Sequence, residues 1–185
     1  ASWGFLSCLP VSGNYGGTYP CDFTVYDEEN GQWYSYALDG AWSTNVQHLG
    51  GQGYMPVTGV YTPSGMENPS VYQRLTGNWI LYTNGITTLF NWGFSTAVPV
   101  PGDYNNDNLS DFAVFDRLTG NWYILSNNRN TVLAWGLNWG YAGCVPVAGD
   151  YDNDGAYDLA VYDPNTAKWY IRSLSGAVIL WGANW

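Results

Sequence analysis

Basic residues are scarce in this chain. Lysine and arginine together number 5 against 15 aspartate and glutamate residues, so the formal net charge at pH 7 is −10. A phosphate backbone would be repelled by such a chain, which argues against nucleic acid as a partner. The chain offers no basic patch for an anionic membrane surface. No apolar run approaches the roughly 18 residues of a membrane span.

Histidine and cysteine are nearly absent. His48 is the single histidine, and the three cysteines are Cys8, Cys21 and Cys144. These numbers argue against multi-histidine metal sites and against a disulfide scaffold. No serine or cysteine stands in a nucleophile motif, and His48 has no identifiable catalytic partner. We therefore expect a protein without catalytic activity.

Aromatic residues and glycine are abundant instead. Phe, Trp and Tyr make up 18% of the 185 residues, charged residues make up 11%, and there are 23 glycines and 9 prolines. Short strands joined by tight turns have this composition, whereas helix bundles need more Ala, Glu, Lys and Leu. The length fits a single domain, 1–185.

The chain contains four copies of one sequence pattern. Residues 98–122 (VPVPGDYNNDNLSDFAVFDRLTGNW) align without a gap with 145–169 (VPVAGDYDNDGAYDLAVYDPNTAKW), and 9–33 and 55–79 are weaker copies. One glycine and one tryptophan recur in every copy, each at spacings of 46, 43 and 47 residues. The glycines are Gly13, Gly59, Gly102 and Gly149, and the tryptophans are Trp33, Trp79, Trp122 and Trp169.

Each copy predicts four short strands. The first is apolar, the second alternates, the third begins at the recurring tryptophan and the fourth ends near Trp-Gly. Four strands in about 45 residues are typical of a propeller blade. We expect an all-β fold, a β-propeller of four four-stranded blades, with repeats at 8–53, 54–96, 97–143 and 144–185. The sequence leaves open whether the ring closes within one chain or whether copies contact one another head to tail.

The loop between the first two strands of the fourth repeat is strongly acidic. It reads Asp150-Tyr-Asp152-Asn-Asp154-Gly155-Ala156-Tyr-Asp158. The four carboxylates converge when such a loop coils, Gly155 permits the sharp turn, and the Ala156 carbonyl adds a neutral oxygen. Hard oxygen ligands in a flexible loop favour Ca²⁺ over Mg²⁺. The alternative is an exposed Asp/Asn turn, but acids this close repel one another without a cation.

The same loop of the third repeat predicts a weaker site. It has three carboxylates instead of four, and Asn108 replaces the glycine. Asparagine tolerates left-handed backbone, so the turn can still form. The first two repeats have lost most of these ligands, and we therefore expect two calcium ions per chain. The ligands of the third repeat are Asp103, Asn105, Asp107, the Leu109 carbonyl and Asp111.

The segment GDYDNDGAYDLAVYDP, followed by a Trp-Tyr strand, resembles FG-GAP/VCBS-type repeats. That family includes the integrin α-subunit propeller, fungal propeller lectins and many bacterial surface proteins. The resemblance spans nearly the whole chain, and it is strong in repeats three and four and weak in repeats one and two. It implies a propeller with calcium in the loops that join the first two strands of a blade, where the metal is usually structural.

Most tryptophans occupy repeat positions and are expected in the core. These are Trp33, Trp79, Trp92, Trp122, Trp135, Trp169 and Trp181. Trp42, Trp139 and Trp185 do not fit the pattern, and an exposed tryptophan can stack on a sugar or anchor a protein contact. The alternative is that these three cover a blade edge or the ring seam.

Two pairings of the cysteines are open. Cys8 and Cys144 occupy the same repeat position, and their repeats are neighbours in a closed ring, so a disulfide between them would close the seam. The rival pairing is Cys8 with Cys21, which leaves Cys144 unpaired.

The expected protein is secreted, either extracellular or on a cell surface, since calcium there satisfies even weak sites. We expect a non-catalytic calcium-binding propeller that acts as an interaction or assembly unit, with a protein partner or copies of itself. The alternative is a lectin that binds carbohydrate through exposed aromatic residues between blades. Asp27, Asp116 and Asp163 recur at one repeat position, which favours turn capping over catalysis.

Overall fold

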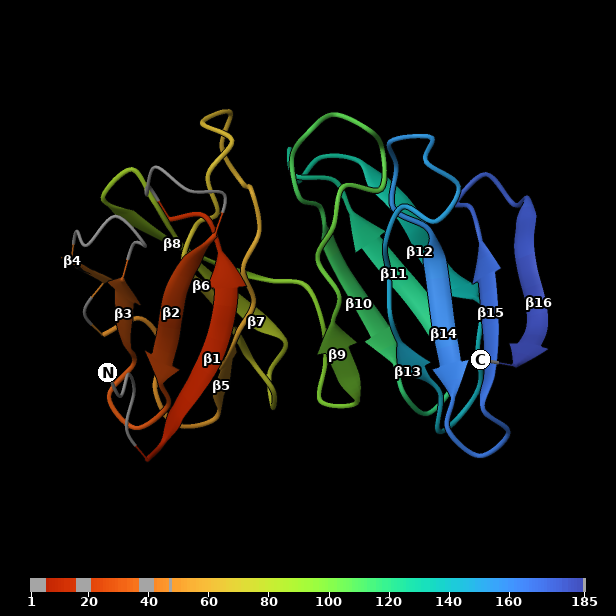
Figure 1. Ribbon diagram of the computed structural model, residues 1–185, viewed down its shortest axis with the longest axis horizontal. Helices are drawn as coiled ribbons and strands as arrows, with labels where there is room; N and C mark the ends of the chain where they lie inside the picture. Colours follow the sequence, from red (N-terminus) through yellow and green to blue (C-terminus); the bar gives the residue numbers. More distant parts are fainter. Residues whose placement is uncertain (1–5, 16–20, 37–41, 47, 185) are drawn as a thin grey trace. The chain divides into compact units, whose positions relative to one another are not determined.

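The computed structural model of the protein describes residues 6–15, 21–36, 42–46 and 48–184, with backbone alone for 42–46. Within these ranges the chain has sixteen strands, and none of the described segments is a helix long and apolar enough to cross a membrane. The strands form four four-stranded antiparallel sheets, each in chain order (Figure 1). The predicted all-β class is confirmed, and each sheet is a propeller blade.

The first two sheets are called blades 1 and 2. Blade 1 consists of β1 (Cys8–Gly13), β2 (Asp22–Asp27), β3 (Gln32–Tyr36) and β4 (Trp42–Val46). Blade 2 consists of β5 (Tyr54–Pro56), β6 (Ser70–Gln73), β7 (Asn78–Thr83) and β8 (Ile86–Asn91).

The other two sheets are blades 3 and 4. Blade 3 consists of β9 (Ala97–Pro99), β10 (Phe112–Asp116), β11 (Asn121–Leu125) and β12 (Val132–Asn138). Blade 4 consists of β13 (Val145–Pro146), β14 (Leu159–Asp163), β15 (Lys168–Arg172) and β16 (Val178–Asn184).

The chain divides into two compact units, residues 1–94 and 95–185. Unit 1 holds blades 1 and 2, and unit 2 holds blades 3 and 4. The division falls close to the predicted boundary between the second and third repeats. A single domain over 1–185 stays a prediction.

The turn between the second and third strands of a blade requires a left-handed residue. Gly31, Gly77 and Gly120 take φ values of 68°, 74° and 76° there, and Ala167 takes 55° in blade 4. At Gly120 a Cβ atom would also lie 2.2 Å from the backbone carbon of Gly140. Glycine therefore relieves both the conformational cost and the close approach at this turn.

The first strand of blades 2, 3 and 4 ends at a proline. The loop that joins the first and second strands, which is the acidic loop in blades 3 and 4, follows it. The residue after each proline still donates its N–H to the second strand, as Val100 does to the Ala113 carbonyl at 2.8 Å and Val147 to the Ala160 carbonyl at 2.9 Å. An isolated bridge further along closes the base of each loop. The bridges are Gly59–Asn68, Gly102–Asp111 and Gly149–Asp158.

Each unit has its own aromatic and aliphatic core. In unit 2, Trp122 and Ile124 of blade 3 share a buried cluster with Leu159 and Val161 of blade 4. In unit 1, Trp33 of blade 1 shares one with Val71 of blade 2. Full burial of side chains of this size contributes about 1.5–3 kcal/mol each, so packing between blades is a major source of stability in each unit.

Candidate metal centre

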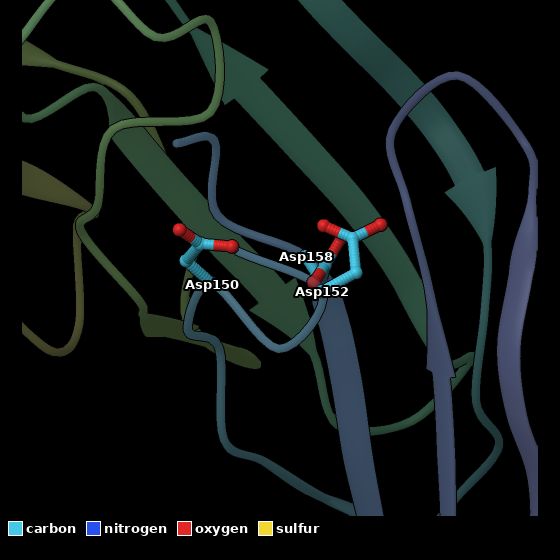
Figure 2. Close-up of side chains that lie close together, drawn as sticks. All are labelled: Asp150, Asp152 and Asp158. Carbon is cyan, nitrogen blue, oxygen red and sulfur yellow. The ribbon is translucent and has the colours of Figure 1, made fainter. Parts of the chain in front are cut away.

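The acidic loop of blade 4 brings three carboxylates together. Oxygen atoms of Asp150, Asp152 and Asp158 lie within 4.8 Å of one another (Figure 2). Asp158 is 1% exposed and lies at the base of the loop, whereas Asp150 and Asp152 are exposed. Three hard anionic oxygens at such spacing are a donor set that a calcium ion prefers.

Hydrogen bonds within the loop hold these side chains. The two carboxylate oxygens of Asp150 accept the N–H groups of Asp154 and Gly155, each at 3.1 Å. Asp152 accepts the Asp154 N–H at 3.2 Å. Left-handed backbone at Asn153 (φ 60°) and Gly155 (φ 94°) gives the tight coil that the sequence predicted.

The carboxylate of Asp158 is electrostatically disfavoured in this setting. Burial raises the pKa of Asp158 above its ordinary value, the hydrogen bond from the Tyr151 N–H lowers it, and the nearby carboxylates of Asp152, Asp154 and Asp150 raise it further. The net shift is upward. A cation among these oxygens would relieve the repulsion.

Two further predicted ligands of blade 4 lie beside this group. The Asp154 carboxylate accepts the Ala156 N–H at 2.8 Å. Asp154, Ala156 and Asp158 also line a hollow of about 380 Å³ together with Asn105. The structure thus groups Asp150, Asp152 and Asp158 most closely and leaves the Asp154 carboxylate bonded within the loop.

The loop of blade 3 is coiled in the same way but gathers its acids less closely. Asp103 accepts the N–H groups of Asn105 at 3.3 Å, Asp107 at 3.1 Å and Asn108 at 2.7 Å. Asp107 accepts the Leu109 N–H at 2.9 Å. Within the residues that the structure describes, this loop forms no group of three acids like that of blade 4.

Asp111 of blade 3 explains part of that difference. One of its oxygens accepts the Tyr104 N–H at 3.0 Å and the other accepts the Asn127 N–H at 2.9 Å. Burial raises the pKa of Asp111, these two amides lower it and the carboxylates of Asp107 and Asp103 raise it, with a result of about 6. Both oxygens are thus engaged by the frame of the blade, and the weaker binding expected at this loop stays a prediction.

The two loops contact each other within unit 2. The side-chain amide of Asn106 donates to the Asp154 carbonyl at 3.2 Å, and the Tyr157 N–H donates to the Asp103 carbonyl at 2.6 Å. Asn105 instead donates to the Ser126 hydroxyl at 3.3 Å. The two loops are therefore joined by one side-chain and one backbone hydrogen bond.

Trp139 occupies a repeat position, which the sequence pattern did not indicate. The indole N–H of Trp122 donates to the Trp139 carbonyl at 2.8 Å, as that of Trp79 does to the Trp92 carbonyl at 2.7 Å. Trp139 is therefore the counterpart of Trp92 and is half-buried. The other two predicted contact residues are Trp42 and Trp185. The structure describes only the backbone of Trp42, at the start of β4, and Trp185 lies outside the described residues.

Two tryptophans expected in the core are on the surface. Trp135 is 73% exposed and Trp181 is 70% exposed. In each case a glycine follows at φ 65°, Gly136 or Gly182, where the register of the outer strand shifts. A bulge of this kind re-aims the neighbouring side chain, which explains why the core prediction was wrong for both.

Trp181 borders an aromatic hollow that the sequence did not indicate. The hollow has a volume of about 320 Å³ and is lined by Asn138, Trp139, Gly140, Tyr141, Tyr170 and Trp181. The rings of Trp139 and Tyr170 lie edge-on to Trp181, with centroids 5.6 Å and 5.2 Å away. The residues come from three separate segments, and no local pattern relates them.

The predicted disulfides are not formed among the described residues. Cys144 is 3% exposed and packs in the apolar core of unit 2, while Cys21 is exposed. The Cys144 thiol therefore fills core space instead of bonding to Cys8. Cys8 lies at the start of β1, in unit 1.

The recurring acids at the end of the second strand cap turns. Asp116 accepts the Leu118 N–H at 3.1 Å and the hydroxyls of Thr119 and Thr96 at 2.6 Å and 2.8 Å. Asp27 and Asp163 accept equivalent bonds in blades 1 and 4. Their oxygens are thus used in holding the blade together.

Comparisons with known proteins support the fold. No protein-family model matches the chain, and no curated protein matches it. Its structure is similar to a crystal structure of BBS1N in complex with ARL6DN, with a TM-score of 0.51 and 12% identity over 97% of this chain and 62% of that one. It is also similar to a protein of unknown function from Bacteroides caccae, with a TM-score of 0.50 and 12% identity over 95% of this chain and 73% of that one. At this identity the likeness shows the β-propeller fold alone.

Proposed function

We propose that the protein is a calcium-stabilised, non-catalytic propeller that serves as an interaction or assembly unit outside the cell. The observation that carries the proposal is the cluster of three carboxylates formed by Asp150, Asp152 and Asp158. When calcium is bound there, it offsets the mutual repulsion of these acids and cross-links the loop to the base of the blade. The chemistry that the ion supplies is structural.

The acids that recur at the end of the second strand favour a non-catalytic role. Asp27, Asp116 and Asp163 accept several hydrogen bonds each from their own turns and from the segment that precedes the blade. Groups held in this way are poor proton-transfer catalysts, because their charged form is stabilised and their pKa values are lowered.

Calcium also favours a location outside the cell. The extracellular concentration satisfies loops with dissociation constants as weak as roughly 10⁻⁴ to 10⁻³ M. A net charge of −10 keeps such a protein soluble, and bound calcium lowers its self-repulsion.

A protein partner is consistent with the similar BBS1 structure, which was determined as a complex with ARL6. Unit 2 also presents large exposed apolar side chains, including Trp135, Trp181 and Val178. Aromatic residues of this kind are enriched at protein interfaces.

Calorimetric titration tests the metal part of the proposal. Calcium chloride added to the metal-free protein should titrate two sites of unequal affinity, and the melting temperature should rise with calcium and fall on chelation. Magnesium chloride at the same concentration is the control and should produce a smaller rise. No heat of binding, with equal melting temperatures in calcium and in chelator, would refute the proposal.

Carbohydrate binding is a second candidate function, supported by the aromatic hollow beside Trp181. The exposed indole offers an apolar face for stacking, and the Tyr141 hydroxyl donates to Asp163 at 2.7 Å, which leaves it able to accept from a ligand hydroxyl. A glycan array in calcium tests it. Trp181→Ala should abolish a signal that Trp135→Ala, an equally exposed tryptophan in the neighbouring blade, leaves intact. Binding that survives Trp181→Ala would argue against this site.

A further inference from the structure

The interface between blades 3 and 4 shows how blades pack in this chain. One face of blade 3, with Trp122 and Ile124 at its centre, is fully buried against Leu159 and Val161 on the second strand of blade 4. The contact therefore joins two different faces, which we call the tryptophan face and the second-strand face. Blades 1 and 2 repeat it in unit 1, where Trp33 lies in one cluster with Val71.

A tyrosine extends the same interface toward the loops. Tyr104 of blade 3 is 2% exposed, and its ring lies edge-on to Tyr157 of blade 4 at 6.0 Å. Its hydroxyl donates to the Val100 carbonyl at 2.8 Å, which fixes the ring. The tryptophan face thus includes this tyrosine.

Blade 4 has its own tryptophan face, built from matching residues. Trp169 and Ile171 take the places of Trp122 and Ile124 in the strand register. Tyr151 takes the place of Tyr104, since its hydroxyl donates to the Val147 carbonyl at 2.7 Å.

This face of blade 4 is partly open, although Ile171 itself is buried. Tyr151 is 43% exposed, and Trp169 is half-buried where Trp122 is fully buried. A hollow of about 330 Å³ lies against the face. It is lined by Tyr151, Trp169, Ile171, Leu180, Ala183 and Asn184.

Blade 1 has an open second-strand face. Phe23 follows Asp22 in β2 as Leu159 follows Asp158 in blade 4, yet Phe23 is 56% exposed and Leu159 is fully buried. Val25, which corresponds to Val161, is half-buried. The two open faces are therefore of opposite kind, and each resembles one half of the interface formed inside unit 2.

We infer that the tryptophan face of blade 4 in one copy binds the second-strand face of blade 1 in another copy. Phe23 of the second copy would enter the hollow beside Trp169 and Leu180, much as Leu159 shares one buried cluster with Trp122 in unit 2. The contact is heterologous, because a tryptophan face meets a second-strand face and never its own kind, and such contacts join copies head to tail. The inference specifies the self-association within the proposed function and rests on it.

Sedimentation velocity in calcium with two single-face variants tests this contact. Wild-type protein should form species that grow with concentration. Leu180→Lys blocks the face of blade 4 and Phe23→Glu blocks that of blade 1, so each variant alone should be monomeric. An equimolar mixture should form a one-to-one dimer that cannot extend, because each variant supplies the intact face that the other lacks. Val178→Lys, on the same strand but outside the hollow, is the matched control and should assemble like the wild type.

Each outcome of this experiment is decisive. A wild-type protein that stays monomeric at the highest attainable concentration overturns the inference, and so does a mixture that stays monomeric while the wild type assembles. Dimerisation of the mixture also shows that both variants are folded. Calcium titration of the same samples separates the two proposals. A monomer that binds calcium overturns only the contact, whereas an assembly that binds none overturns only the metal site.

Discussion

Blades 2 and 4 have the same loop frame but very different loop chemistry. In both, a backbone bridge closes the loop, between Gly59 and Asn68 in blade 2. The Asn68 side-chain oxygen accepts the Tyr61 N–H at 3.0 Å, and in blade 4 the Asp158 carboxylate accepts the Tyr151 N–H at 2.9 Å. The frame therefore needs an acceptor at this position, and an uncharged amide is sufficient.

The other acids of blade 4 are also dispensable for the frame. Where blade 4 has Asp150, Asp152 and Asp154, blade 2 has Val60, Thr62 and Ser64. Blade 2 nevertheless keeps the left-handed turn, with Gly65 at φ 73° and Gly155 of blade 4 at φ 94°. These acids are therefore not required for the left-handed turn, and the proposed cation site would give their clustered charges a role.

The largest expected effect comes from making blade 4 resemble blade 2. Asp150→Asn combined with Asp158→Asn removes two ligand charges. The remaining side-chain oxygen at position 158 can still accept the Tyr151 N–H, that at position 150 can accept the Gly155 N–H, and Asp152 still accepts the Asp154 N–H. The calcium-dependent stabilisation, about 2.7 kcal/mol when calcium is 100 times its dissociation constant, should be largely lost. Chemical unfolding in calcium and in chelator measures it.

The control for that experiment removes the same charge elsewhere. The double variant Glu28→Gln, Glu29→Gln changes a turn of blade 1. Glu28 forms a partly exposed ion pair with Arg74 there, at 3.6 Å, and such a pair contributes little to stability. This variant should keep the full calcium effect. If both variants respond to calcium like the wild type, the carboxylates of blade 4 are not the ligands.

A smaller effect is expected at the residue that caps the turn after the second strand, which is Asp116 in blade 3. Burial raises the pKa of Asp116, but hydrogen bonds from Thr119, the Leu118 N–H and Thr96 outweigh it, so the pKa lies below 3.8. A lowered pKa contributes stability above the unfolded value, and this contribution is lost as the pH falls through the folded value. Asp116→Asn should cost about 0.5–1.5 kcal/mol near neutral pH, as for a typical hydrogen bond, and less below pH 3.8.

Blade 2 provides the reference for this pH dependence. Its cap is Gln73, which does not titrate and accepts from Thr76. Gln73→Ala should therefore destabilise the protein equally at neutral and acid pH. Urea unfolding at several pH values distinguishes the two caps, and a constant cost for Asp116→Asn across this range would contradict the assignment.

The fold and the acidic loops were predictable because their signals are local. Strand alternation, turn glycines and Asp spacing lie within single copies of the repeat, and Asp150, Asp152 and Asp158 are brought together by one loop. The exposure of Trp135 and Trp181 was not predictable in this way. It depends on register shifts between the third and fourth strands, which neither strand encodes by itself.

The smallest expected effect concerns the turn position that differs between the two acidic loops. Asn108 of blade 3 adopts φ 65°, which asparagine tolerates, so Asn108→Gly should change the free energy of unfolding by less than about 0.5 kcal/mol, because relief of strain and the greater freedom of the unfolded chain oppose each other. The reverse exchange in blade 4 is not equivalent. A Cβ atom at Gly155 would lie 2.7 Å from the side-chain nitrogen of Asn106, which bonds the Asp154 carbonyl. Gly155→Asn should therefore destabilise more than Asn108→Gly. Urea unfolding of both variants in chelator measures the difference without calcium, and equal effects would show that the contact between the loops has no energetic consequence.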